Sequence, residues 1–287
     1  MATLKNTTVN DTSFLTLPSG TVAQRPGSPV QGMARFNNQI NEVEVYNGTA
    51  WYSNSNPVQT SLLVYLDANY TASYPGTGST WFDLSGNGNN FTLYNSPTYI
   101  KGAIGFNGSN QYAASVNNIN LSSYNSITVE TWFRANNTSD GMILEHTTNW
   151  NTQTGGWGLY INSTGSTNQA NMMHTNHNSE GARNYAFTID TNWNCQTNIF
   201  SIISDSTGRL SYGNGNLLSF DSGAGYPTNT ITTAGGSFPN AILYLGSRAG
   251  TGGFLNGSIS VIKIYGTKLT AAQITQNFYA LNGRYGI

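Results

Sequence analysis

Short apolar stretches, separated by clusters of Gly, Asn and Ser, are the feature that most restricts the fold of residues 60–287. Several of them alternate apolar and polar side chains, as strands with one buried face do. We expect strands at residues 62–66, 104–106, 112–116, 126–134, 142–145, 157–161, 185–189, 199–204, 242–246 and 257–265. Many short strands are typical of two packed sheets, so the predicted fold is all-β, a jelly-roll-like antiparallel β-sandwich.

One helix is predicted near the C-terminus. Thr270 and Gln273 form a capping box, in which each side chain can bond a free backbone N–H at the helix start. Three apolar residues then recur at helical spacing, namely Ile274, Phe278 and Leu281. We expect Asn282-Gly283 to end this helix.

The first 57 residues differ from the rest, because they hold four of the eight prolines, Pro18, Pro26, Pro29 and Pro57. Residues 18–29 should run extended, since proline fixes its own φ and restricts the preceding residue. Short strands are expected at residues 33–36, 43–46 and 50–52. Such a meander is too small to bury a core of its own. We therefore predict an arm, residues 1–57, that packs on a second copy, on the sandwich domain of residues 58–287 or on a larger particle.

Residues 42–46 of the arm predict an assembly face. Val43 and Val45 alternate with Glu42 and Glu44, so one face of this strand is apolar. An apolar face with no core beneath it needs a second surface to cover it. We expect Val43, Val45 and Trp51 to hold a symmetric homo-oligomer, and we favour a trimer.

The charge of the chain excludes several classes of partner. Only 8% of the residues are charged, the net charge is −1, and the 11 Lys and Arg residues are scattered. Nucleic acids and anionic membrane surfaces bind clustered basic residues, so we expect neither as a partner. No apolar run approaches the ~20 residues that cross a bilayer, so we expect no membrane insertion.

The cysteine content and the N-terminus bear on where the protein folds. Cys195 is the single cysteine, so no internal disulfide can form, and the first residues lack the apolar segment of a signal peptide. Yet a composition rich in Tyr, Trp, Asn and Thr is that of an extracellular, carbohydrate-handling protein. A phage virion protein, made in the host cytoplasm and released by lysis, satisfies both observations.

Several motifs of the sandwich domain occur in a specific order, among them Val64-Tyr-Leu-Asp-Ala-Asn69, Trp81-Phe-Asp-Leu-Ser-Gly-Asn-Gly-Asn89, Ile127-Thr-Val-Glu-Thr-Trp132, Gly156-Trp-Gly-Leu-Tyr160 and Phe254-Leu-Asn-Gly-Ser-Ile259. In this order they resemble the laminin-G/concanavalin A-like lectin domain of phage and bacterial surface proteins. The arm, through Leu17-Pro-Ser-Gly-Thr-Val-Ala-Gln-Arg-Pro26 and Val45-Tyr-Asn-Gly-Thr-Ala-Trp51, resembles the N-terminal segments of phage tail-fibre and head-fibre proteins. That resemblance implies an arm that attaches or trimerises.

Catalytic motifs are scarce. Glucanases with a sandwich fold need two carboxylates about 5–9 Å apart, and Glu130 is the only acid on its predicted strand. Glu145 is a candidate second carboxylate, but nothing in the sequence places it on the same face. Neither a Gly-x-Ser-x-Gly motif nor a phosphate-binding Gly-rich loop occurs. We therefore expect no enzymatic activity, a structural role for Glu130 beside Trp132, and a buried or half-buried, unreactive Cys195.

The sequence contains two candidate metal sites. Asp83, with oxygen side chains at alternate positions after it and Gly88 within the loop, partly mimics the first half of a calcium loop, but its second half lacks a bidentate Glu. A weak calcium site and a tight turn held by the Asp83 side chain both stay open. Two residues separate His174 from His177, whereas a helical His-x3-His zinc motif has three, so we expect no zinc and no other cofactor.

Sugar binding needs an aromatic platform and planar hydrogen-bonding groups. Trp150 lies in a predicted loop at residues 147–155, while His174, His177 and Arg183 lie in or beside a second loop-like stretch. These four are the candidate ligand residues, and Trp157 is expected in the core. The predicted function is a non-enzymatic phage virion surface protein, either a tail or head fibre or a capsid decoration protein. Its partners would be other virion proteins and host surface glycan. A glycan-active hydrolase and a bacterial surface adhesin remain alternatives.

Overall fold

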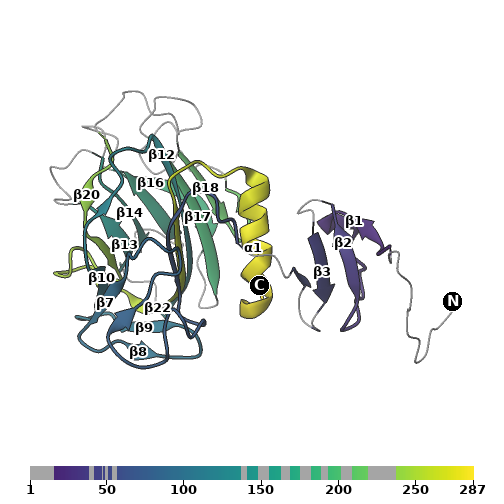
Figure 1. Cartoon of the computed structure of the whole chain (residues 1–287), viewed down its shortest axis with the longest axis horizontal. Helices are drawn as coiled ribbons and strands as arrows, with labels where there is room; N and C mark the ends of the chain where they lie inside the picture. Colours follow the sequence, from purple (N-terminus) through teal and green to yellow (C-terminus); the bar gives the residue numbers. More distant parts are fainter. Residues whose placement is uncertain are drawn as a thin grey trace.

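The computed structural model describes residues 16–38, 42–46, 48, 51–53, 57–136, 141–147, 155–162, 169–174, 182–188, 193–201, 209–218 and 237–287. Within them the chain forms a two-sheet sandwich, a helix at its C-terminal end and a small N-terminal sheet (Figure 1). The predicted all-β sandwich with one C-terminal helix is confirmed. None of the described helices is long and apolar enough to cross a membrane.

The first sheet of the sandwich is called the helix sheet, because the helix covers its outer face. Its strand order is β19-β18-β17-β12-β22-β9-β8, and β5 also pairs with β22. The strands are β5 (Leu62–Asp67), β8 (Thr98–Tyr99), β9 (Ile104–Asn107), β12 (Ser126–Ala135), β17 (Asn194–Ser201), β18 (Arg209–Gly213), β19 (Asn216–Leu217) and β22 (Asn256–Tyr265). The strand β22, predicted to be an inner strand, pairs with β12, β9 and β5.

The second sheet is called the tyrosine sheet, after side chains on its outer face. Its order is β16-β15-β14-β13-β21-β10-β7-β6. The strands are β6 (Thr80–Trp81), β7 (Phe91–Tyr94), β10 (Tyr112–Ser115), β13 (Gly141–His146), β14 (Trp157–Asn162), β15 (Gln169–His174), β16 (Ala182–Thr188) and β21 (Leu243–Leu245). A separate short pair consists of β11 (Ile119–Asn120) and β20 (Asn240–Ala241). The strand β21 lies between β13 and β10 in the sheet, although it is far from both in sequence.

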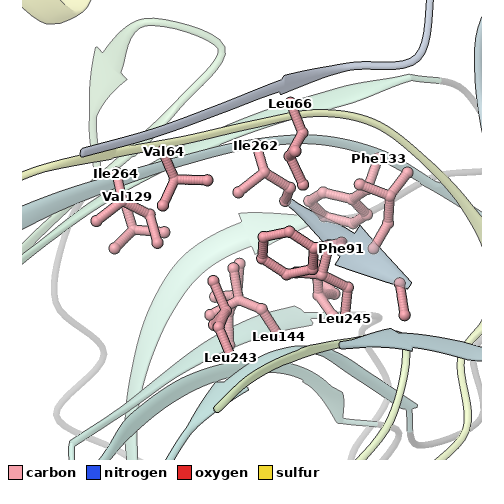
Figure 2. Close-up of a cluster of buried hydrophobic side chains, with 14 of the residues drawn as sticks. Val64, Leu66, Phe91, Val129, Phe133, Leu144, Leu243, Leu245, Ile262 and Ile264 are labelled. Carbon is pink, nitrogen blue, oxygen red and sulfur yellow. The ribbon is translucent and has the colours of Figure 1, made fainter. Parts of the chain in front are cut away.

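The core lies between the two sheets. Figure 2 shows Val129, Ile262 and Ile264 of the helix sheet facing Leu144, Leu243 and Leu245 of the tyrosine sheet. Trp157 is fully buried in this core, as predicted. Each such side chain stabilises the fold by about 1.5–3 kcal/mol relative to exposure. The cross-strand pairs fix the register, because a slip of one residue would turn these side chains to solvent.

The helix α1 (Ala271–Tyr285) packs on the outer face of the helix sheet (Figure 1). It begins with the predicted capping box, in which Thr270 accepts a hydrogen bond from the Gln273 N–H. The apolar face is also as predicted, with Ile274, Phe278 and Leu281 buried.

The predicted end of the helix is wrong, because α1 continues through Gly283 and stops at Gly286, which adopts φ 70°. The last turn is held by two contacts to the sheet. Arg284 bonds Asp67 at 2.7 Å, and the Tyr285 and Ser260 hydroxyls lie 2.6 Å apart. These contacts stabilise helical backbone beyond Gly283 and leave the left-handed position to the next glycine.

A layer of paired charges lies between α1 and the helix sheet. Lys263 donates to Glu130 at 2.8 Å, and both side chains are fully buried. The same carboxylate accepts from the Trp132 indole and from the Asn277 amide, each at 2.8 Å. The structural role predicted for Glu130 beside Trp132 is therefore confirmed. Cys195 is buried in this layer, as predicted, and burial raises the pKa of its thiol.

The arm contains a four-stranded sheet in the order β1-β2-β3-β4. Its elements are β1 (Ser19–Gly20), η1 (Val22–Gln24), β2 (Ala34–Asn37), β3 (Glu42–Tyr46) and β4 (Trp51–Ser53). Three of its strands, β2 to β4, lie where they were predicted. The expectation that residues 18–29 run extended is wrong at Val22–Gln24, which form a 3-10 turn. Gln24 causes this local turn, since its side chain accepts from the Thr21 backbone N–H at 2.9 Å.

The arm turns its charged face toward α1. Glu44 is buried and lies 2.6 Å from Arg25 and 3.4 Å from Arg35. The Arg25 guanidinium also lies over the Tyr279 ring of α1, 4.7 Å from its centroid. Trp51 is only 6% exposed and its strand β4 contacts α1, so Trp51 packs within the chain. The prediction that Trp51 joins Val43 and Val45 at an interface between copies is corrected here, since Trp51 points to the opposite face.

Candidate functional site

A row of tyrosines runs across the outer face of the tyrosine sheet. Tyr94 ends β7, Tyr112 begins β10, and Tyr244 is the middle residue of β21. Their neighbours Leu93 and Ala113 belong to the core, so alternation along the strands turns the tyrosines outward. Pairing of Tyr112 with Tyr94, and of β10 with β21, then brings the three side chains together.

The rings are packed against each other. Tyr94 and Tyr112 stack with centroids 4.6 Å apart and planes 8° apart. Tyr244 and Phe254 flank Tyr112 at 6.3 and 6.4 Å. Tyr94 remains 41% exposed, so one ring face is open to solvent. Such a face can stack on the apolar side of a sugar ring.

The three hydroxyl groups are close enough to influence one another. Burial raises the pKa of Tyr112 and of Tyr244, and the neighbouring phenols raise it further. Among the described residues, no hydrogen bond is made by the hydroxyls of Tyr94, Tyr112 and Tyr244. They are therefore free to donate to, and accept from, a ligand rich in hydroxyls.

Glu145 extends the row onto the next strand. It lies on β13 directly opposite Tyr244, and Gly158 of β14 lies opposite it on the other side. The residue is 1% exposed, and its Oε2 has no hydrogen-bond partner among the described residues. Burial raises the pKa of this carboxyl to about 7, although the Ala249 N–H and the charge of Arg248 act in the opposite direction. An ordinary glutamate would be fully ionised at that pH.

A tight turn at residues 247–253 covers Glu145 and Tyr112. Arg248 donates its backbone N–H to Gly252 at 2.7 Å, and Gly250 donates to the Ser247 hydroxyl at 3.1 Å. Ala249 has φ 51° and Gly250 has φ 70°, so two successive residues are left-handed. For alanine this conformation is unfavourable and requires support from its surroundings. The hydrogen bond from the Ala249 N–H to Glu145 supplies such support.

Glu130 and Glu145 do not form a catalytic pair. Glu130 points from β12 toward α1, whereas Glu145 points away from the core on the far sheet. Stacked sheets are about 10 Å apart, so two carboxyls on opposite outer faces are separated by more than that. Hydrolysis by a carboxylate pair needs about 5–9.5 Å.

Asp83 is fully engaged by its own loop and by the neighbouring strand β5. Its Oδ1 accepts from the backbone N–H groups of Tyr65 and Ser85 at 2.9 and 3.0 Å. Its Oδ2 accepts from the Ser85 hydroxyl and the Asn89 N–H at 2.7 and 2.9 Å. This is the geometry of the tight turn. Within the described ranges, no three His, Cys, Asp or Glu residues are grouped as metal ligands would be.

A shallow groove of about 200 Å³ lies between α1 and the turn that joins β18 to β19. It is lined by tyrosines, amides and apolar groups, with Leu217 exposed at its rim. None of the described residues that line it is charged. It therefore offers less chemistry than the tyrosine row.

A family model described as the concanavalin A-like lectin/glucanases superfamily matches residues 107–275, more than half of the chain. The chain belongs to this superfamily. The predicted resemblance to a laminin-G/concanavalin A-like domain is thereby confirmed. No curated protein matches the sequence.

Solved structures share the concanavalin A-like fold at low identity. Trypanosoma rangeli sialidase in complex with sialic acid has a TM-score of 0.56 and 14% identity, over 77% of this chain and 33% of that one. The binding domain of botulinum neurotoxin DC in complex with SialylT has a TM-score of 0.54 and 17% identity, over 78% and 52%. The chain thus spans a third to a half of these proteins. The likeness establishes the fold, which serves both enzymes and binding domains.

The ligand residues predicted for this concanavalin A-like domain are only partly placed. Trp150 and His177 lie outside the described residues. His174 ends β15, where it pairs with Trp157, and Arg183 pairs with Met172 from β16. Both therefore lie in strands rather than in the predicted loop. Residues 169–174 contain no β-branched residue and no Phe, Tyr or Trp, and they form a strand because their backbone pairs with the buried strand β14. Ligand binding by these four residues stays a prediction.

Sequence reasoning missed the tyrosine row. Each strand carries the signal, as in Leu243-Tyr244-Leu245, where one tyrosine alternates with core residues. The strands β13, β21, β10 and β7 are neighbours only through long-range pairing. Local alternation could show that Tyr244 faces outward, but it could not show that Tyr112 and Glu145 lie beside it.

Proposed function

We propose that this protein is a non-enzymatic surface protein of a phage virion, and that its tyrosine sheet binds host surface glycan. The observation that carries glycan binding is the row of Tyr94, Tyr112 and Tyr244, with free hydroxyls and one exposed ring face. Stacking on a sugar ring and hydrogen bonding to its hydroxyls are the two interactions that such ligands require.

The order of the arm, the helix α1 and the two sheets supports display of the tyrosine row on a particle. The arm packs on α1, α1 covers the helix sheet, and the tyrosine sheet, whose outer face carries the tyrosine row, lies on the far side of the sandwich (Figure 1). A particle that held the arm would leave the tyrosine row pointing outward. The likeness of the arm to tail-fibre and head-fibre segments is the reason to choose a phage particle. The proposal covers two positions on the particle, that of a tail or head fibre and that of a capsid decoration protein.

A glycan-active hydrolase is the second candidate, because a pKa of about 7 suits a general acid. The separation of Glu130 from Glu145 favours binding over hydrolysis.

The test of glycan binding uses the full chain on immobilised bacterial polysaccharides and on host cells. We expect Tyr112→Ala and Tyr94→Ala to abolish binding, while the exposed Tyr70→Ala on another surface keeps it. Retained binding in both variants of the row would refute the site. Release of reducing ends that disappears in Glu145→Gln would instead establish the hydrolase.

The virion role has its own test. Locating the chain in a density map of the intact particle should show the arm at the particle surface and the tyrosine row facing away from it. Purified particles that lack the chain would refute the role.

A further inference from the structure

We propose that Glu145 makes the tyrosine row selective for glycans that carry a free, positively charged amino group. The inference rests on the proposed function, because it names the class of sugar that the same site prefers. It starts from a difference between Glu145 and the other buried acids.

The other buried carboxylates of the described residues are matched by cations. Glu44 has Arg25 and Arg35, Asp67 has Arg284 at 2.7 Å, and Glu130 has Lys263 at 2.8 Å. Glu145 is equally buried, yet no cation lies within ion-pair distance of it among the described residues, and its Oε2 is unpartnered. Leaving a buried carboxylate without a cation is costly. An ammonium group from a ligand would supply the missing charge and three donors.

The surroundings of Glu145 suit a small cation. Tyr244 lies opposite Glu145, and the Tyr112 and Tyr94 rings continue the row. Aromatic rings attract cations through their faces. The turn at residues 247–253 lies against the carboxyl through the Ala249 N–H, and Glu145 is 1% exposed, so a large group cannot approach it. An amino substituent on a sugar ring satisfies these conditions, while the rest of the sugar lies along the tyrosines.

The same geometry disfavours acidic sugars. A sugar carboxylate placed on the row would approach Glu145, and two carboxylates in one site repel each other. The sialyl ligands named for the two structural neighbours therefore do not transfer to this site. An N-acetylated sugar is also disfavoured, because its amide carries no charge and adds bulk beneath the turn.

The experiment compares matched oligosaccharides that differ in one substituent. Glucosamine oligomers and their N-acetylated counterparts are titrated into the full chain by calorimetry at pH 7.5. We expect the free amine to bind about tenfold tighter or more, as a charge-assisted hydrogen bond allows. Glu145→Gln, which keeps the shape of the side chain, should lose this preference and leave the N-acetylated oligomer unaffected. Tyr94→Ala should weaken both ligands, and Tyr70→Ala neither.

The outcomes separate the two proposals. Equal affinity of the wild-type chain for both oligomers, or an equal loss of both in Glu145→Gln, would overturn amine selectivity. If neutral oligosaccharides bind and Tyr94→Ala abolishes that binding, the proposed glycan function still stands. If neither the free-amine nor the N-acetylated oligosaccharide binds, amine selectivity is refuted. If the chain also binds no glycan on a polysaccharide array, glycan binding itself is refuted. Circular dichroism identifies any variant that has lost its fold. For such a variant, the thermal shift of the wild type by glucosamine oligomers decides whether the amine binds.

Discussion

At the scale of single residues, buried charge separates structural positions from the candidate site. Glu130 and Asp67 are matched by Lys263 and Arg284 and hold α1 on the sheet. Glu145 is buried without such a match, and its pKa of about 7 follows from that. A stable fold tolerates few such residues, and they concentrate at functional sites.

The pKa of Glu145 predicts how stability depends on pH. The folded chain holds this proton more tightly than the unfolded chain, whose glutamates titrate near 4.5. The resulting stabilisation is complete below about pH 4.5 and is lost as the pH rises through 7. Glu145→Gln removes the titration, so we expect it to match the wild type at pH 4.5 and to be more stable by about 1–2 kcal/mol at pH 8, allowing for partial solvent screening.

Urea unfolding at the two pH values measures this difference. Tyr244 from β21 and Arg248 from the covering turn are the titratable groups that face Glu145. Burial raises the pKa of Tyr244 above its usual value, so this phenol stays neutral between pH 4.5 and 8, and the pH dependence reports Glu145. A difference of the same size at both pH values would contradict the assignment.

The charge layer under α1 predicts a larger effect. Lys263→Met leaves the fully buried Glu130 carboxyl without its cation. We expect a loss of about 3–5 kcal/mol in the free energy of unfolding. Adding Glu130→Gln removes the stranded charge and should restore part of the loss, because its single amide oxygen can still accept from one of the two donors, Trp132 or Asn277. Chemical denaturation of both variants checks the prediction, and a double variant no better than the single one would argue against it.

At the scale of elements, the turn at residues 247–253 shapes the site. A Cβ on Gly250 would lie 2.9 Å from the Tyr112 ring, at a φ of 70° that alanine adopts poorly. We expect Gly250→Ala to cost about 1–2 kcal/mol and to weaken glycan binding, since Tyr112 must move. Gly252→Ala is the matched control, because a Cβ there meets nothing within 4 Å. Thermal melting and glycan titration compare the two, and equal behaviour would show that the turn does not position Tyr112.

Elements with strong local signals were predictable from the sequence. The strands β12 and β22 alternate or are apolar on both faces, and α1 carries a capping box and a clear apolar face. The strands β15 and β18 were missed because neither contains a β-branched residue, and pairing with β14 and β17 supplies the strand structure. The candidate site was out of reach for a related reason. Glu145, Tyr244 and Tyr112 meet only through pairing between strands about a hundred residues apart, which local patterning does not encode.

At the scale of the whole molecule, the arm lies with its polar side inward. Glu44, Arg25 and Trp51 face α1, while the opposite face of the arm sheet carries Val43 and Val45. Val43 is 44% exposed and Val45 is half-buried. The apolar face predicted from the alternation at residues 42–46 is thus partly exposed among the described residues of the single chain. The homo-oligomer, and the trimer in particular, stay predictions.

Substitution on that face tests the oligomer. We expect Val45→Asp to dissociate it, because a charge at a buried apolar contact is costly. Ser28→Asp adds the same charge at another exposed site of the arm and should leave assembly unchanged. Trp51→Ala should loosen the arm from α1 without dissociating the copies. Light scattering gives the mass of each variant, and a monomeric wild type would refute the prediction.

The stacking of Arg25 on Tyr279 joins the beginning of the chain to its end. More than 200 residues separate the two, and a ribosome makes the arm first. The arm therefore has no surface to pack against until α1 has been synthesised and has folded onto the sandwich. A chain truncated before α1 would carry a loose arm with its charged face exposed. An assembly that required the arm to be packed on α1 would in this way exclude unfinished chains.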